Sequence, residues 1–72
     1  MHEDTIQIQI EIPKEEIGYL VSLFEGYDSL AVARTLDNQR GLMELMVAPD
    51  FLDETRRLLE AIKLEIPLRI LT

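Results

Sequence analysis

The chain contains no cysteine and only one histidine among its 72 residues. Without cysteine there can be no disulfide bond, and a structural zinc site normally needs several cysteine or histidine ligands. A serine or threonine nucleophile would also lack a credible base, because the one histidine, His2, lies at the chain end. These absences argue against a metal, a cofactor and catalytic residues, so we expect a protein that is not an enzyme.

Basic residues and long apolar runs are scarce as well. Seven Lys and Arg face fourteen Asp and Glu, which gives a formal net charge of −7. Binding to nucleic acid or to an anionic membrane needs a basic face, which this composition disfavours. No apolar run approaches the about 18 residues of a spanning helix, and the acidic N-terminus is unlike a signal peptide. We therefore expect a cytoplasmic protein whose partners include neither nucleic acid nor membrane.

What the sequence does have is strict alternation of apolar residues near both ends. Every second position is an isoleucine over residues 6–12, and every second position is leucine or isoleucine over residues 64–70. A period of two places each set on one face of a β-strand. We therefore predict strands over residues 5–12 and 64–71. Pro67 has no N–H for a ladder, so the second strand should lie at a sheet edge.

Between these strands, apolar residues recur twice at the spacing of a helix. The first stripe begins at Ile17 and ends at Phe24, with intervals of i, i+3, i+4 and i+7. It predicts a helix over residues 14–25. A second stripe of the same kind predicts a helix over residues 49–63.

The segment between the two helices predicts a β-hairpin. Its strands should cover residues 30–36 and 42–48, and Gly41 can adopt the positive φ that the turn at 37–41 requires. The resulting element order is β-α-β-β-α-β, which is the ferredoxin-like arrangement. We predict one α+β domain over residues 1–72, with a four-stranded antiparallel sheet in the order 4-1-3-2 and both helices on one face.

The hairpin has one register that agrees with its side chains. If Leu36 faces Leu42, Arg34 faces Glu44 as a favourable pair of opposite charges. A slip by one residue would reverse one strand's faces and lose this pair. The same register sets small residues opposite large ones on the other face, in the pairs Ala31–Val47, Ala33–Leu45 and Thr35–Met43.

Two arginines and an aspartate gather near the hairpin turn and could form a ligand site. Arg34 and Arg40 could hold a carboxylate or phosphate, with Asp37 orienting one of them. The alternative is a plain cross-strand pair of Arg34 with Glu44 beside an ordinary solvated turn, which is the interpretation we favour. A small anionic ligand at these three residues is therefore a hypothesis.

The outward face of the predicted sheet carries an apolar patch. Its members are Leu30, Val32, Leu36, Leu42 and Met46. With helices on one side only, this patch would meet water, and contiguous exposed apolar surface usually marks an interface. The alternatives are that the two faces are exchanged, or that a loop or terminus covers the patch. A domain of this size also gains from a partner subunit, so we expect a homo-oligomer, as a dimer, with a binding or regulatory role.

Several stretches resemble a known family. They read EGY at 25–27, VARTLD at 32–37, GLMELMVAPDF at 41–51 and LL at 58–59. These resemble a family of small bacterial proteins described as a domain of unknown function, which implies no activity. The layout is more distantly similar to ACT and NIL domains, small ferredoxin-like regulatory modules that often bind amino acids and associate through their sheets. That similarity implies, as an alternative function, a sensor of an amino acid or another small anion, although residues 11–15 lack the glycine common in the ligand loop of ACT domains.

Overall fold

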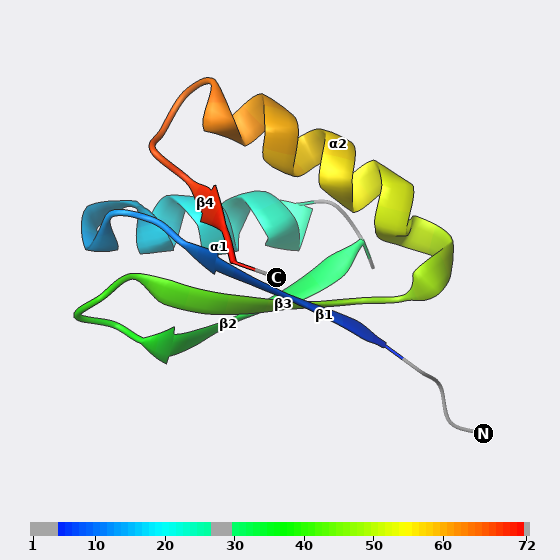
Figure 1. Cartoon of the computed structure of the whole chain (residues 1–72), viewed down its shortest axis with the longest axis horizontal. Helices are drawn as coiled ribbons and strands as arrows, with labels where there is room; N and C mark the ends of the chain where they lie inside the picture. Colours follow the sequence, from blue (N-terminus) through cyan, green and yellow to red (C-terminus); the bar gives the residue numbers. More distant parts are fainter. Residues whose placement is uncertain (1–4, 27–29, 72) are drawn as a thin grey trace.

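The computed structural model describes residues 5–26 and 30–71, so His2 and Tyr27 lie outside the described residues. The elements are β1 (Ile6–Glu11), the 3-10 turn η1 (Lys14–Glu16), α1 (Ile17–Gly26), β2 (Ala31–Asp37), β3 (Leu42–Val47), the 3-10 turn η2 (Pro49–Phe51), α2 (Leu52–Lys63) and β4 (Arg69–Ile70). The strands form one antiparallel sheet in the order β2-β3-β1-β4, and both helices lie on the same face of it (Figure 1). The predicted α+β, ferredoxin-like fold and its strand order are confirmed.

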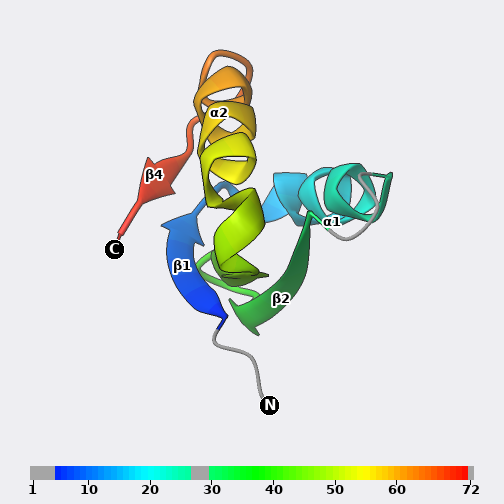
Figure 2. The same cartoon turned by 90° about the vertical axis from the view of Figure 1, so that its right-hand side faces the viewer.

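The core lies between the sheet and the two helices. Figure 2 shows α1 and α2 on the same side of β1 and β2, so one face of each strand is covered. Ile10, Met43 and Leu45 from the sheet are fully buried, as are Leu20 of α1 and Leu59 of α2. Each such side chain contributes about 1.5–3 kcal/mol when it is removed from water. The isoleucine alternation in β1 therefore faces the helices, as predicted.

The hairpin register is confirmed except at its turn end. Arg34 pairs with Glu44 and Thr35 pairs with Met43, but a bulge then shifts the register. Asp37, not Leu36, lies opposite Leu42, so the predicted pairing of Leu36 with Leu42 is wrong. The extra residue lies on β2 between Thr35 and Asp37, and it increases the local twist of β2 just before the turn.

Gly41 connects this turn to the end of β1. Its φ is +72°, and the N–H of Ile12 donates a hydrogen bond of 3.0 Å to its carbonyl oxygen. A Cβ atom at Gly41 would lie 1.7 Å from the carbonyl oxygen of Ile12. The turn therefore needs glycine for both its backbone angle and its close approach to β1.

Strand β4 is much shorter than the predicted strand over residues 64–71. The N–H groups of Leu64, Glu65 and Ile66 donate to carbonyl groups at the end of α2 and so cannot join a ladder. Leu64 is 88% exposed, whereas Ile66 and Leu68 are buried as the alternation predicts. The edge position of β4 is confirmed. Within the described residues, no helix has the length and apolarity needed to cross a membrane.

Candidate functional site

The sheet face opposite the helices is uncovered by any described element (Figure 1). Strand register arranges its side chains in rows that cross β2, β3 and β1. On β2 and β3, one row contains Val32 and Met46, and the next contains Arg34 and Glu44; on β1 the rows continue with Gln7 and Gln9. Val32 is 61% exposed and Met46 is half-buried. On β2 and β3, an apolar row therefore lies directly beside a charged row.

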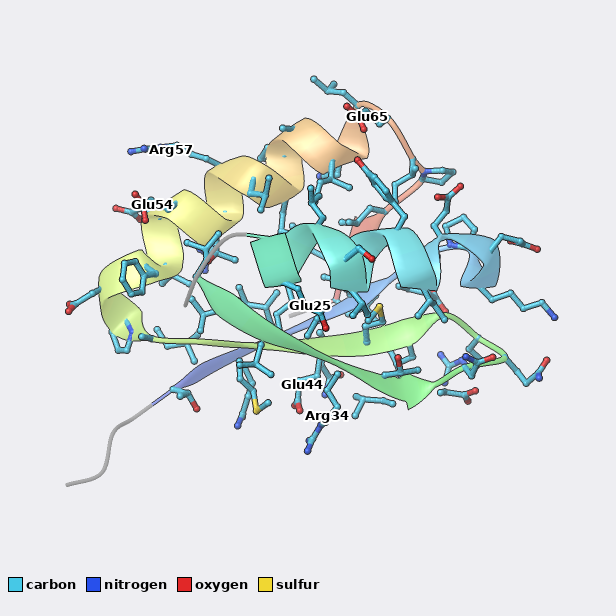
Figure 3. All side chains as sticks on the ribbon, turned by 180° about the vertical axis from the view of Figure 1, so that it is seen from behind. Glu25, Arg34, Glu44, Glu54, Arg57 and Glu65 are labelled. Atoms are coloured by element: carbon cyan, nitrogen blue, oxygen red, sulfur yellow. The ribbon has the colours of Figure 1, made fainter. Side chains whose placement is uncertain are left out.

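The charged row holds a close ion pair. Arg34 Nη2 lies 2.7 Å from Glu44 Oε1, and Figure 3 shows both side chains on the open side of the sheet. The Glu44 side chain is only 11% exposed, whereas that of Arg34 is 58% exposed. Arg34 thus covers a carboxylate that would otherwise meet water, and the predicted cross-strand pair is confirmed.

The rest of the predicted apolar patch is divided between the two sides of the sheet. Leu36 is 41% exposed and Leu42 is half-buried. Leu30 is 8% exposed and belongs to the core under the helices, so its predicted outward orientation is wrong. The physical reason is that β2 begins at Ala31, so strand alternation does not extend to position 30.

Leu30 instead borders a cavity on the helix side. The cavity has a volume of about 260 Å³, and the α2 residues Glu54, Arg57 and Leu58 line it with Leu30. Figure 3 shows Glu54 and Arg57 projecting from α2 away from the sheet. The cavity is therefore separate from the open sheet face.

Asp37 serves the hairpin turn in this structure. Its Oδ1 atom accepts hydrogen bonds from the backbone N–H groups of Gln39 and Arg40, at 3.1 and 3.3 Å. Aspartate commonly stabilises turns in this way. Within the described residues, Asp37 forms no ion pair and no side-chain to side-chain hydrogen bond with an arginine.

The two arginines of the predicted ligand site lie beside different carboxylates. Arg34 pairs with Glu44, whereas Arg40 Nη2 lies 3.7 Å from Glu11 Oε2. Glu11 has another arginine beside it, because Arg69 Nη2 of β4 lies 3.8 Å from Glu11 Oε1. The structure therefore brings Arg40 together with Arg69 around Glu11. A ligand-binding role for Arg34, Asp37 and Arg40 stays a prediction.

Glu11, Arg40 and Arg69 border a groove at one end of the sheet. The groove has a volume of about 370 Å³ and is lined by Glu11, Ile12, Pro13, Arg40, Pro67, Leu68 and Arg69. Three parts of the chain thus meet there, namely the end of β1, the hairpin turn and the entry to β4. Sequence reasoning missed Arg69 as a site residue. The available signal was that Glu11 and Arg69 both lie at outward positions of strands predicted to be neighbours.

The side chains of this surface offer charged and apolar contacts. Within the part of the chain that the structure describes, no group of three His, Cys, Asp or Glu side chains could hold a metal ion. The polar groups that do converge are guanidinium and carboxylate pairs. Such pairs recognise oxyanions or complementary charges on another protein.

Comparison with known proteins identifies one family. No curated protein and no solved structure matches the chain. The model of a family described as a domain of unknown function (DUF4911) matches residues 10–66, which is most of the chain and includes the strands of the hairpin, both helices and Arg40. The chain therefore belongs to the DUF4911 family.

Proposed function

We propose that this domain is a non-catalytic binding or regulatory module that associates with a second copy of itself through the open sheet face. The observation that carries the proposal is the uncovered row of Val32 and Met46 beside the Arg34–Glu44 pair. Exposed apolar rows of this kind are typical of interfaces. The lack of cysteine and of any histidine beyond His2 supports the non-catalytic role.

A second copy is the preferred occupant because the face is complementary to itself. A two-fold axis parallel to the strands and between β2 and β3 would place β2 of each copy over β3 of the other. Arg34 would then lie over Glu44 of the second copy, and Val32 over Met46 of the second copy. Charged rows meet charged rows and apolar rows meet apolar rows, which is the pairing that an isologous interface requires.

The size of the face sets the expected strength of the dimer. Strands of six or seven residues are about 20 Å long, and the two strands that overlap in this arrangement, β2 and β3, span about 10 Å across the sheet. The overlap therefore offers about 200 Å² per copy, or about 400 Å² in total, whereas stable interfaces bury at least about 1,200 Å². We expect a weak dimer whose population depends on protein concentration.

The first test places a charge on the apolar row. Sedimentation of the wild-type protein, measured from about 10 µM to about 1 mM, should show a monomer–dimer equilibrium in the range expected for a small interface. Val32→Glu and Met46→Glu should remain monomeric throughout, because a carboxylate would be buried without a partner. Leu64→Glu is the matched control, since Leu64 is 88% exposed at the end of α2 and away from this face. Sheet variants that are folded by circular dichroism and still dimerise like the wild type would refute the proposal.

A charge exchange tests the two-fold arrangement itself. Arg34→Glu and Glu44→Arg should each weaken the dimer, because each sets like charges against each other. The double variant restores opposite charges both within a copy and between copies, so it should dimerise again. A double variant that folds but stays monomeric would contradict the predicted placement of Arg34 over Glu44 of the second copy. The cytoplasmic location expected from the sequence stays a prediction.

A further inference from the structure

The groove at the end of the sheet contains guanidinium groups with unused donors. Arg40 and Arg69 lie 3.7 and 3.8 Å from the two oxygens of Glu11, which is beyond the distance of a hydrogen bond. Neither guanidinium makes a side-chain hydrogen bond within the described residues. Each carries five N–H donors in a planar fork that matches carboxylate and phosphate.

The charges in the groove do not cancel. Two arginines face one glutamate, so the cluster of Glu11, Arg40 and Arg69 carries a formal charge of +1 within a chain of net charge −7. The Glu11 side chain is 26% exposed, and the arginine side chains are 61% and 75% exposed. The guanidinium groups are therefore accessible from solvent. The Glu11 carboxylate attracts both of them, so they lie on either side of it at this end of the sheet.

The remaining walls of the groove are apolar. Ile12 and Leu68 are buried beneath it, and Pro13 and Pro67 have no backbone N–H to offer. A volume of about 370 Å³ lies within the range of small-molecule sites, which are mostly apolar with a few placed polar groups. The groove thus combines an apolar wall with the guanidinium groups of Arg40 and Arg69.

We propose that this groove binds a small organic oxyanion, a carboxylate or phosphate on a compact apolar body, between Arg40 and Arg69. The oxyanion accepts hydrogen bonds from both guanidinium groups, and the body packs on Pro13, Pro67 and Leu68. Glu11 competes with the ligand for the two arginines, so it limits affinity and makes binding reversible at modest ligand concentration. The site is distinct from the Arg34–Glu44 row on which the proposed dimer rests.

The test follows the arginine side-chain N–H signals by NMR during titration. The ligands are inorganic phosphate and phenyl phosphate, of which only the second carries an apolar body. Both should shift the signals of Arg40 and Arg69 saturably, and phenyl phosphate should bind more tightly because its ring covers the apolar wall. Arg69→Gln should weaken binding about tenfold, since it removes charge-assisted hydrogen bonds.

Two further variants make the result decisive. Glu11→Gln should strengthen binding, because it removes the competing carboxylate while leaving the groove in place. Arg56→Gln is the matched control: it makes the same charge change on the exposed surface of α2 and should bind like the wild type. The proposal fails if the folded Glu11→Gln protein shows no saturable shift, or if Arg56→Gln weakens binding as much as Arg69→Gln. Anion binding should persist in Val32→Glu, so the failure of the dimer proposal and the failure of this one are separable.

Discussion

Replacing Gly41 with alanine should be one of the most damaging single-methyl additions in this chain. The added Cβ would lie 1.7 Å from the carbonyl oxygen of Ile12 and 2.9 Å from its carbonyl carbon. Both atoms belong to the backbone of the segment that leaves β1, so they cannot rotate away as a side chain would. The turn and β1 would have to separate by more than about 1 Å to reach ordinary contact distances.

Three contributions set the size of the effect. Alanine at a φ of +72° costs about 1–2 kcal/mol relative to the ordinary backbone regions. Separating the two segments weakens the hydrogen bond from Ile12 N to Gly41 O, at about 1 kcal/mol. Relief of the clash adds further strain, so we expect a loss of about 3 kcal/mol or more. A 72-residue domain has about 4–11 kcal/mol of stability in total.

Urea unfolding monitored by circular dichroism measures this loss as a fall in the midpoint at constant m-value. Gly41→Asn separates the causes, because asparagine tolerates a positive φ but brings the same Cβ; it should be nearly as unstable as Gly41→Ala. Gly18→Ala is the control, since nothing lies within 4 Å of its added Cβ in the exposed part of α1. It should gain about 0.5–1 kcal/mol. A Gly41→Ala protein that loses less than about 1 kcal/mol would refute the steric argument.

Two further predictions concern single side chains, and the same urea unfolding measures both. Thr55 is fully buried in α2 and its Oγ1 has no hydrogen-bond partner among residues 5–26 and 30–71, so Thr55→Val should stabilise the domain by about 1 kcal/mol because it removes an unpaired polar atom; an equal or lower stability would show that the hydroxyl has a partner. Leu64 is 88% exposed and Leu68 is 6% exposed, so Leu64→Ala should change stability by less than about 0.5 kcal/mol and Leu68→Ala should cost about 2–5 kcal/mol. Equal losses at the two positions would mean that Leu64 is as buried as Leu68.

The fold could be predicted from the sequence because its main patterns reinforce one another. Ile8, Ile10 and Ile12 alternate in a way that allows only one buried face, and Pro67 restricts its strand to an edge. The pairing of Arg34 with Glu44 fixed the hairpin register before the turn. Each of these signals is local, and the β-α-β-β-α-β order then leaves few topologies.

The errors arose where periodicity reports burial but not hydrogen bonding. Ile66 and Leu68 are buried at alternate positions as a strand would have them, yet the N–H of Ile66 donates to the carbonyl of Ile62 in α2. Extending the β2 alternation back to Leu30 failed for the same reason, because the strand has not begun there. A pattern of side chains therefore locates the buried face more reliably than it locates the ends of a ladder.

The candidate groove was missed because its side-chain pairing depends on the register of a two-residue strand. Arg69 lies opposite Glu11 only through the β1–β4 pairing, in which Ile10 faces Ile70. Nothing local in the sequence sets that pairing. The sequence shows that Arg40 lies in the hairpin turn. Its partner Glu11 is distant in the sequence, and only the folded sheet brings the two side chains together.

The two prolines of the groove explain why it is open. Continuing the observed β1–β4 register by two residues would set Ile12 opposite Leu68 and Pro13 opposite Pro67. Neither proline has an N–H, so the ladder cannot continue past Glu11 and Arg69. The two segments are not paired beyond that point, and the N–H of Ile12 donates to Gly41 on the β3 side of β1. The same absence of donors that shortens β4 therefore leaves an apolar gap directly beside the last paired residues, which are the carboxylate and one of the two guanidinium groups that define the proposed anion site.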